Sequence, residues 1–67
     1  MVWFLERESE VLVCELRHVN EGDHFEFAMR SPGQPETVER FSEPTRVLET
    51  LLARQRHLYQ AGWRPKG

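Results

Sequence analysis

The chain has 67 residues, of which 30% are charged and 39% are hydrophobic, and its formal net charge is −2 at pH 7. That length predicts a single small domain over residues 1–67, and folding buries only about 60% of the surface that such an unfolded chain exposes. The charge excludes a general attraction to phosphate backbones or anionic lipid.

The cellular compartment follows from two features of the sequence. The single cysteine rules out an internal disulfide, which favours a reducing environment. The first residues lack the pattern of a signal peptide, and no segment approaches the roughly 20 apolar residues of a membrane span. We therefore expect a cytoplasmic protein with no membrane partner.

Three strands are predicted in the first half of the chain. Residues 1–7 are apolar at nearly every position, which indicates a strand with apolar groups on both faces. Residues 10–18 and 23–30 alternate between apolar and polar side chains, which is typical of half-buried strands. The apolar face that they share is expected to consist of Trp3, Leu5, Leu12, Cys14, Leu16, Phe25, Phe27 and Met29.

The pairing register follows from keeping the large apolar residues on one face. A two-residue turn at 8–9 places Trp3 opposite Cys14. A four-residue loop at 19–22 places Cys14 opposite Phe27. The three strands therefore form an antiparallel meander.

The next segment is predicted to turn and then to form a fourth strand. Residues 31–35 suit a type II turn, with Gly33 at the position that requires positive φ. Residues 36–41 alternate irregularly, because Val38 and Phe41 cannot both point inward from a regular strand. We expect a short edge strand, after which Phe41 turns under the start of the helix.

A helix is predicted over residues 42–63. Ser42 is the expected N-cap, and Gly62 followed by Trp63 is the pattern of a Schellman cap, in which Trp63 folds back onto Leu58. The apolar stripe of the helix, expected to be buried against the sheet, contains Val47, Leu48, Leu51, Leu52, Leu58 and Tyr59.

The predicted fold class is α+β: a meander of three to four strands with one C-terminal amphipathic helix packed across one face. Residues 64–67 are expected to be a loose tail. Gln55 lies within the apolar stripe of the helix, so its amide needs a hydrogen-bond partner, for which we expect strand backbone.

No pattern of residues indicates catalysis, a cofactor or a metal. His18, His24 and His57 are predicted to point in three different directions, and no metal-ligand spacing is present. Cys14 lies on an apolar strand face, where a small core residue is expected rather than a nucleophile. We therefore predict no enzyme, no cofactor and no metal site.

The leading hypothesis is a non-catalytic module for protein interaction or self-association. Its alternative is a small nucleic-acid-binding module that uses one of two surfaces. The first is the outer sheet face, with Arg17, Arg30, Arg40 and Arg7, and the second is the basic end of the helix at 54–57, together with Arg64 and Lys66. Acidic residues are mixed among these arginines, and the outer face lacks aromatic stacking platforms, so the sequence disfavours nucleic acid.

A specific contact surface is predicted on the sheet face that the helix leaves uncovered. The cluster consists of Val2, Phe4, Val11 and Val13, which the register brings together on the outer face. The first strand is expected to be unpaired on its outer side and carries no proline or lysine to discourage pairing. We therefore predict that the partner is another protein or the chain itself, most simply as a symmetric homodimer.

Overall fold

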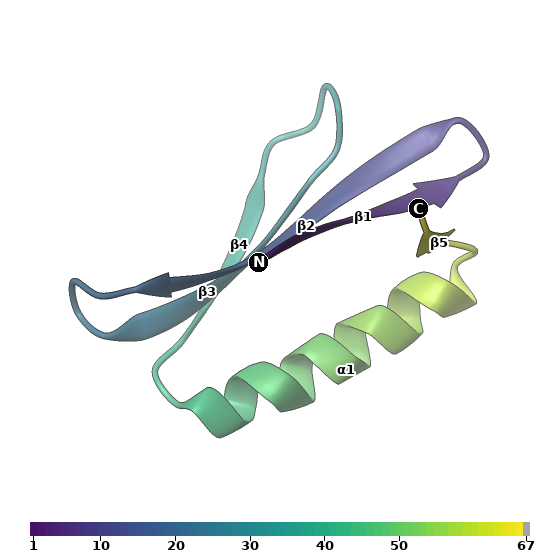
Figure 1. Ribbon diagram of the computed structural model, residues 1–67. Coiled ribbons are helices and arrows are strands. Elements are labelled where there is room, and N and C mark those ends of the chain that lie inside the picture. Colours follow the sequence, from purple (N-terminus) through teal and green to yellow (C-terminus); the bar gives the residue numbers. More distant parts are fainter. Residues whose placement is uncertain (67) are drawn as a thin grey trace.

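The computed structural model describes residues 1–66 and contains a five-stranded antiparallel sheet with one helix. The strand order is β4-β3-β2-β1-β5, and α1 lies along one face of the sheet (Figure 1). The elements in chain order are β1 (Val2–Arg7), β2 (Glu10–Val19), β3 (His24–Arg30), β4 (Thr37–Phe41), α1 (Pro44–Gln60) and β5 (Arg64–Pro65). The predicted α+β class, with a meander and a single carboxy-terminal helix, is confirmed.

The first hairpin has the predicted register. Trp3 pairs with Cys14, and Leu5 pairs with Leu12. The chain reverses at a tight turn in which Glu8 takes a φ of 54°. The alternation of side chains along a strand therefore places Trp3, Leu5 and Cys14 on the face that α1 covers.

The second hairpin differs from the prediction by two residues. Cys14 pairs with Met29, whereas the sequence analysis paired it with Phe27. The loop ends later than expected, because Gly22 and Asp23 both take positive φ, at 91° and 47°. A shift of two residues keeps every side chain on its predicted face, which explains why the alternation pattern did not distinguish the two registers.

The predicted turn and fourth strand are both present. The backbone N–H of Gln34 donates to the carbonyl oxygen of Ser31 at 3.0 Å, and Gly33 takes a φ of 77°, as a type II turn requires. β4 is an edge strand on which Val38 is 42% exposed. Phe41, at its end, packs against the core.

The helix begins one residue later than predicted. Glu43, not Ser42, is the N-cap, and no side chain caps the first turn with a hydrogen bond. Pro44 follows, where its missing N–H removes a donor that has no partner within the helix. Within residues 1–66, no helix has the length and apolar character needed to cross a membrane.

The carboxy-terminal end of α1 forms the predicted Schellman motif. The N–H of Gly62 donates to the carbonyl oxygen of Tyr59 at 3.1 Å, and the N–H of Trp63 donates to that of Leu58 at 3.0 Å. Gly62 takes a φ of 99°. Trp63 is buried in the core cluster, against which Leu58 also packs.

The chain after the cap differs from the loose tail predicted for residues 64–67. Arg64 and Pro65 form β5, which pairs with β1, and the N–H of Lys66 donates to the carbonyl oxygen of Phe4 at 2.9 Å. The cause is the burial of Trp63 beside β1, which directs the following residues along that strand. Gly67 lies outside the described residues.

The core is small, and the helix contributes little to it. Among helical residues only Val47 is buried, while Leu51 and Leu58 are half-buried. Leu48 and Leu52 are 62% and 57% exposed, so their predicted burial against the sheet was wrong. The buried apolar residues are Leu5, Cys14, Phe27, Ala28, Val47 and Trp63.

Candidate interaction site between α1 and β1

Only one side of the apolar stripe of α1 rests on the sheet. At about 100° per residue, Leu51 and Leu58 lie within about 40° of the buried Val47. On the same scale Leu48 lies at about 100° and Leu52 at about 140°, and both are exposed. The stripe is therefore wider than the contact that α1 makes with the sheet.

The tilt of the helix explains this division. α1 packs mainly against β3 and β4, where Arg54 forms an ion pair with Glu39 at 2.7 Å. Its carboxy-terminal end is held at the opposite side of the sheet by Trp63. α1 makes few contacts with β1 and β2, and Leu48 and Leu52 in the outer half of the stripe remain exposed.

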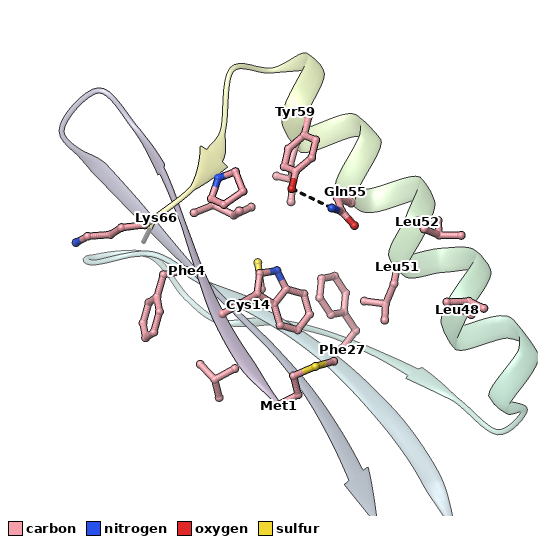
Figure 2. A pocket seen from close by; sticks show the side chains of 15 residues that line it. Met1, Phe4, Cys14, Phe27, Leu48, Leu51, Leu52, Gln55, Tyr59 and Lys66 are labelled. Atoms are coloured by element: carbon pink, nitrogen blue, oxygen red, sulfur yellow. Dashed lines mark hydrogen bonds between the residues drawn. The ribbon is translucent and has the colours of Figure 1, made fainter.

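An open apolar groove of about 650 Å³ lies beside this outer half of the stripe. Its floor includes Trp3 and Phe27, whose rings stack with centroids 6.0 Å apart, and Figure 2 shows Leu51 directed toward Phe27. Leu48 and Leu52 line it from α1. The full lining is Met1, Val2, Trp3, Phe4, Leu5, Cys14, Phe27, Leu48, Leu51, Leu52, Gln55, Leu58, Tyr59, Pro65 and Lys66.

Gln55 finds its hydrogen-bond partner within the groove. Its Nε2 donates to the hydroxyl oxygen of Tyr59 at 2.9 Å, one turn further along the helix (Figure 2). The expectation of a strand-backbone partner was therefore wrong, because the gap between α1 and the sheet leaves this amide exposed. The pair places a small polar spot on an otherwise apolar wall.

Cys14 forms part of the groove floor and is a core residue, as predicted. Its side chain is fully buried, and burial raises the pKa of the thiol to about 11. A thiol with that pKa is almost entirely protonated at neutral pH, whereas the thiolate is the nucleophile. The groove therefore offers an apolar binding surface rather than a reactive sulfur.

The four predicted contact residues are brought together on the sheet face away from α1. Phe4 pairs with Val13, and Val2 and Phe4 are 47% and 48% exposed, whereas Val11 and Val13 are half-buried. The expected free edge of β1 was wrong over Phe4 to Glu6, because β5 and Lys66 pair there. Val2 and Phe4 also border the groove, so the two apolar regions meet along β1.

The exposure of Leu48 and Leu52 could not be predicted from the apolar sequence pattern. Leu48 and Leu52 follow the same periodicity as the residues that pack on the sheet, so periodicity alone placed them in the core. Gln55 was a signal of where the buried part of the stripe ends. It lies at about 80° around the helix from Val47, between the buried and the exposed halves of the stripe. A polar amide at that angle indicates that the helix surface beyond it is exposed to solvent and not packed on the sheet.

Ion pairs occupy the centre of the outer sheet face. Arg17 contacts Glu15 at 3.1 Å and Glu36 at 3.0 Å, and Arg30 lies 3.4 Å from each of the same carboxylates. Hydrogen bonds from Arg17, and then from Arg30, lower the pKa of Glu15 despite its partial desolvation. The cations on this face are therefore matched by neighbouring anions.

Glu26 extends the same network toward β4. Arg40 donates to its carboxylate at 3.0 Å, and His24 lies 3.5 Å from it. Burial raises the pKa of Glu26, but the neighbouring His24 and the hydrogen bond from Arg40 outweigh that effect, so that its pKa is lowered overall. Arg40, like Arg17 and Arg30, therefore has a carboxylate partner.

The three histidines lie in different places. His18 stacks on Phe25 with ring centroids 4.7 Å apart, on the inner face. His24 lies beside Glu26 on the outer face, and His57 is exposed on α1. Among residues 1–66, no group of three or more His, Cys, Asp or Glu side chains has an arrangement that could hold a metal ion.

Comparisons with known proteins identified no relative of this chain. No protein-family model matches the chain, and no curated protein or solved structure matches it.

Proposed function

We propose that this chain is a non-catalytic protein-interaction module that acts by self-association, and that two copies meet over the groove between α1 and β1. The observation that carries the proposal is the exposure of Leu48 and Leu52, at 62% and 57%, beside an open apolar groove. A contiguous exposed apolar surface of this kind is typical of an interface. Covering it would remove both leucines from water.

The dimensions of the chain support the proposal. The 8.0 kDa chain exposes 5018 Å² of surface, whereas a compact monomer of that mass exposes about 4450 Å². The Cα radius of gyration is 12.4 Å, against about 10.9 Å for a compact domain of this length. The excess surface, about 570 Å², approaches the roughly 800 Å² that each partner buries in a standard interface.

Nucleic-acid binding is the alternative, and the outer face offers it little support. The three arginines that would contact phosphate there, Arg17, Arg30 and Arg40, all form ion pairs with glutamates. Phosphate would have to displace these carboxylates. Fluorescence anisotropy with random-sequence duplex and single-stranded DNA at low salt tests for nucleic-acid binding. We expect no binding, and salt-sensitive binding would favour the alternative.

A cytoplasmic location stays a prediction.

Static light scattering from about 1 μM to 1 mM tests self-association. We expect the mass of the wild-type protein to rise from one chain to two, and Leu52→Glu to keep the protein monomeric by placing a charge beside the groove. Because Leu52 is exposed in the single chain, circular dichroism should show an unchanged fold. A single-chain mass for the wild type at 1 mM would overturn the proposal.

Val11→Glu separates the groove from the outer face, because Val11 belongs to the outer cluster but does not line the groove. If the cluster of Val2, Phe4, Val11 and Val13 is the interface, this variant alone should become monomeric. If the groove is the interface, Leu52→Glu should have the larger effect. Because Val11 is half-buried, circular dichroism should accompany the measurement to show that the Val11→Glu variant keeps its fold.

A further inference from the structure

The helix carries two exposed charges beside the row of exposed leucines. Measured around the helix axis from the buried Val47, Glu49 lies at about 200° and Arg56 at about 180°. Both are therefore next to Leu52, which lies at about 140°. Neither forms an ion pair with any residue from 1 to 66. They are separated by about 10.5 Å along the helix axis, so they do not reach each other within one chain.

A symmetric pair of helices would bring these charges together. Suppose that two copies of α1 pack antiparallel about a two-fold axis near Leu52. Residue 49 of one copy then lies at the same height along the helix axis as residue 55 of the other copy, and residue 48 lies at the same height as residue 56. Glu49 then lies within about 1.5 Å, along the axis, of Arg56 of the second copy. Because of the two-fold symmetry, the dimer contains two such contacts.

The opposite arrangement is unfavourable. In a parallel pair, Glu49 lies at the same height as Glu49 of the second copy and Arg56 at the same height as its own equivalent, so neither charge meets one of opposite sign. The helix dipoles also oppose parallel packing and favour antiparallel packing. The order of Glu49 and Arg56 along α1 therefore favours an antiparallel arrangement of two copies of this chain.

We infer, on the basis of the proposed self-association, that the dimer is built on an antiparallel pair of α1 helices, with Leu52 near the two-fold axis and Glu49 of each copy paired with Arg56 of the other. Leu52 of each copy packs against the other, and Leu48 packs on the aliphatic stem of Arg56 from the second copy. The helix pair then buries Leu48 and Leu52, which line the rim of the groove, between the two copies.

Charge reversal in separate chains tests this geometry. Glu49→Arg alone creates two repulsive contacts in a homodimer, and Arg56→Glu alone does the same. We expect each variant to raise the dissociation constant about tenfold. An equimolar mixture should restore the wild-type affinity, because a heterodimer of the two variants regains two attractive pairs. Sedimentation velocity with one variant fluorescently labelled measures the heterodimer directly.

Two further variants complete the experiment. The double variant Glu49→Arg with Arg56→Glu should form a homodimer of wild-type affinity. Arg46→Glu, an exposed arginine on another side of α1, should leave the dissociation constant unchanged. All these positions are exposed in the single chain, so each variant should retain the helical signal.

The outcomes distinguish the inference from the proposal on which it rests. If the wild type dimerises but the mixture associates no more tightly than the single variants, the antiparallel helix pair is wrong and self-association stands. If the wild type is monomeric at every concentration, the proposed function itself fails.

Discussion

The guanidinium of Arg7 lies 4.5 Å from the centre of the Trp63 ring and holds the end of α1 against β1. The same side chain donates from Nη1 to the carbonyl oxygen of Ala61, the C-cap residue, at 3.1 Å. Glu10 orients it through an ion pair at 3.1 Å. One residue of β1 therefore satisfies a free helix carbonyl and covers the tryptophan that closes the core.

Arg7→Met should destabilise the domain by about 1 kcal/mol, since it removes a partly exposed cation–π contact and a hydrogen bond to a helix carbonyl. Urea unfolding followed by tryptophan fluorescence measures the loss. Arg46→Met is the matched control, because Arg46 is exposed on α1 and belongs to none of these contacts. An equal effect of the two substitutions would show that the Arg7 contacts contribute nothing specific.

Leu51→Ala and Leu52→Ala should affect stability in different ways. Leu51 packs on the core, so its truncation should cost about 2 kcal/mol or more at every protein concentration. Leu52 is exposed in the single chain, so its truncation should lower only the part of the stability that increases with protein concentration. Thermal unfolding at about 5 μM and 500 μM separates the two effects. A concentration-independent loss at Leu52 would indicate that it is buried within one chain.

Stability should decrease in acid because of the outer-face glutamates. The pKa values of Glu15 and Glu26 are lowered in the folded protein. Their contribution is therefore fully present above the unfolded carboxyl pKa, about 4.3, and is lost as the pH falls through the lower folded values. Glu26→Gln should reduce the melting temperature at pH 7 and flatten its decline below pH 5, whereas Glu21→Gln, in an exposed loop, should change neither. A wild-type melting temperature that stays constant down to pH 3 would contradict this account.

Cys14 should resist alkylation in the folded protein. With its pKa raised to about 11 by burial, only about 0.1% of the thiol is ionised at pH 8. Iodoacetamide at pH 8 should therefore modify it slowly in buffer and rapidly in 6 M guanidinium chloride, as mass spectrometry would show. Rapid modification without denaturant would mean that the groove floor opens to solvent.

Much of the fold follows from periodicity and turn residues. The alternation in β2 and β3 assigned the correct faces, and Gly33 and Gly62 marked a turn and a cap that are both present. Two features depended on distant contacts. The register of Cys14 against β3 depends on where the hairpin loop ends, and β5 forms only because Trp63 buries itself beside β1.

The candidate site was harder to predict than the fold. The outer cluster was found because strand alternation identifies both faces of a sheet, and Phe4 and Val13 do pair. The groove was missed because the position of α1 over the sheet is set by its packing on β3 and β4 and by the burial of Trp63, and not by its own periodicity. Helical spacing gives the width of an apolar stripe but not the part of it that the sheet covers.

If a second copy covers the groove, the methyl groups of Leu48 and Leu52 should be shielded from solvent at high protein concentration. Methyl NMR at about 1 mM protein with a dissolved gadolinium chelate measures the line broadening of each group. We expect both leucines to be protected relative to Val38, which is 42% exposed on β4. Broadening of Leu48 and Leu52 as strong as that of Val38 would contradict this expectation.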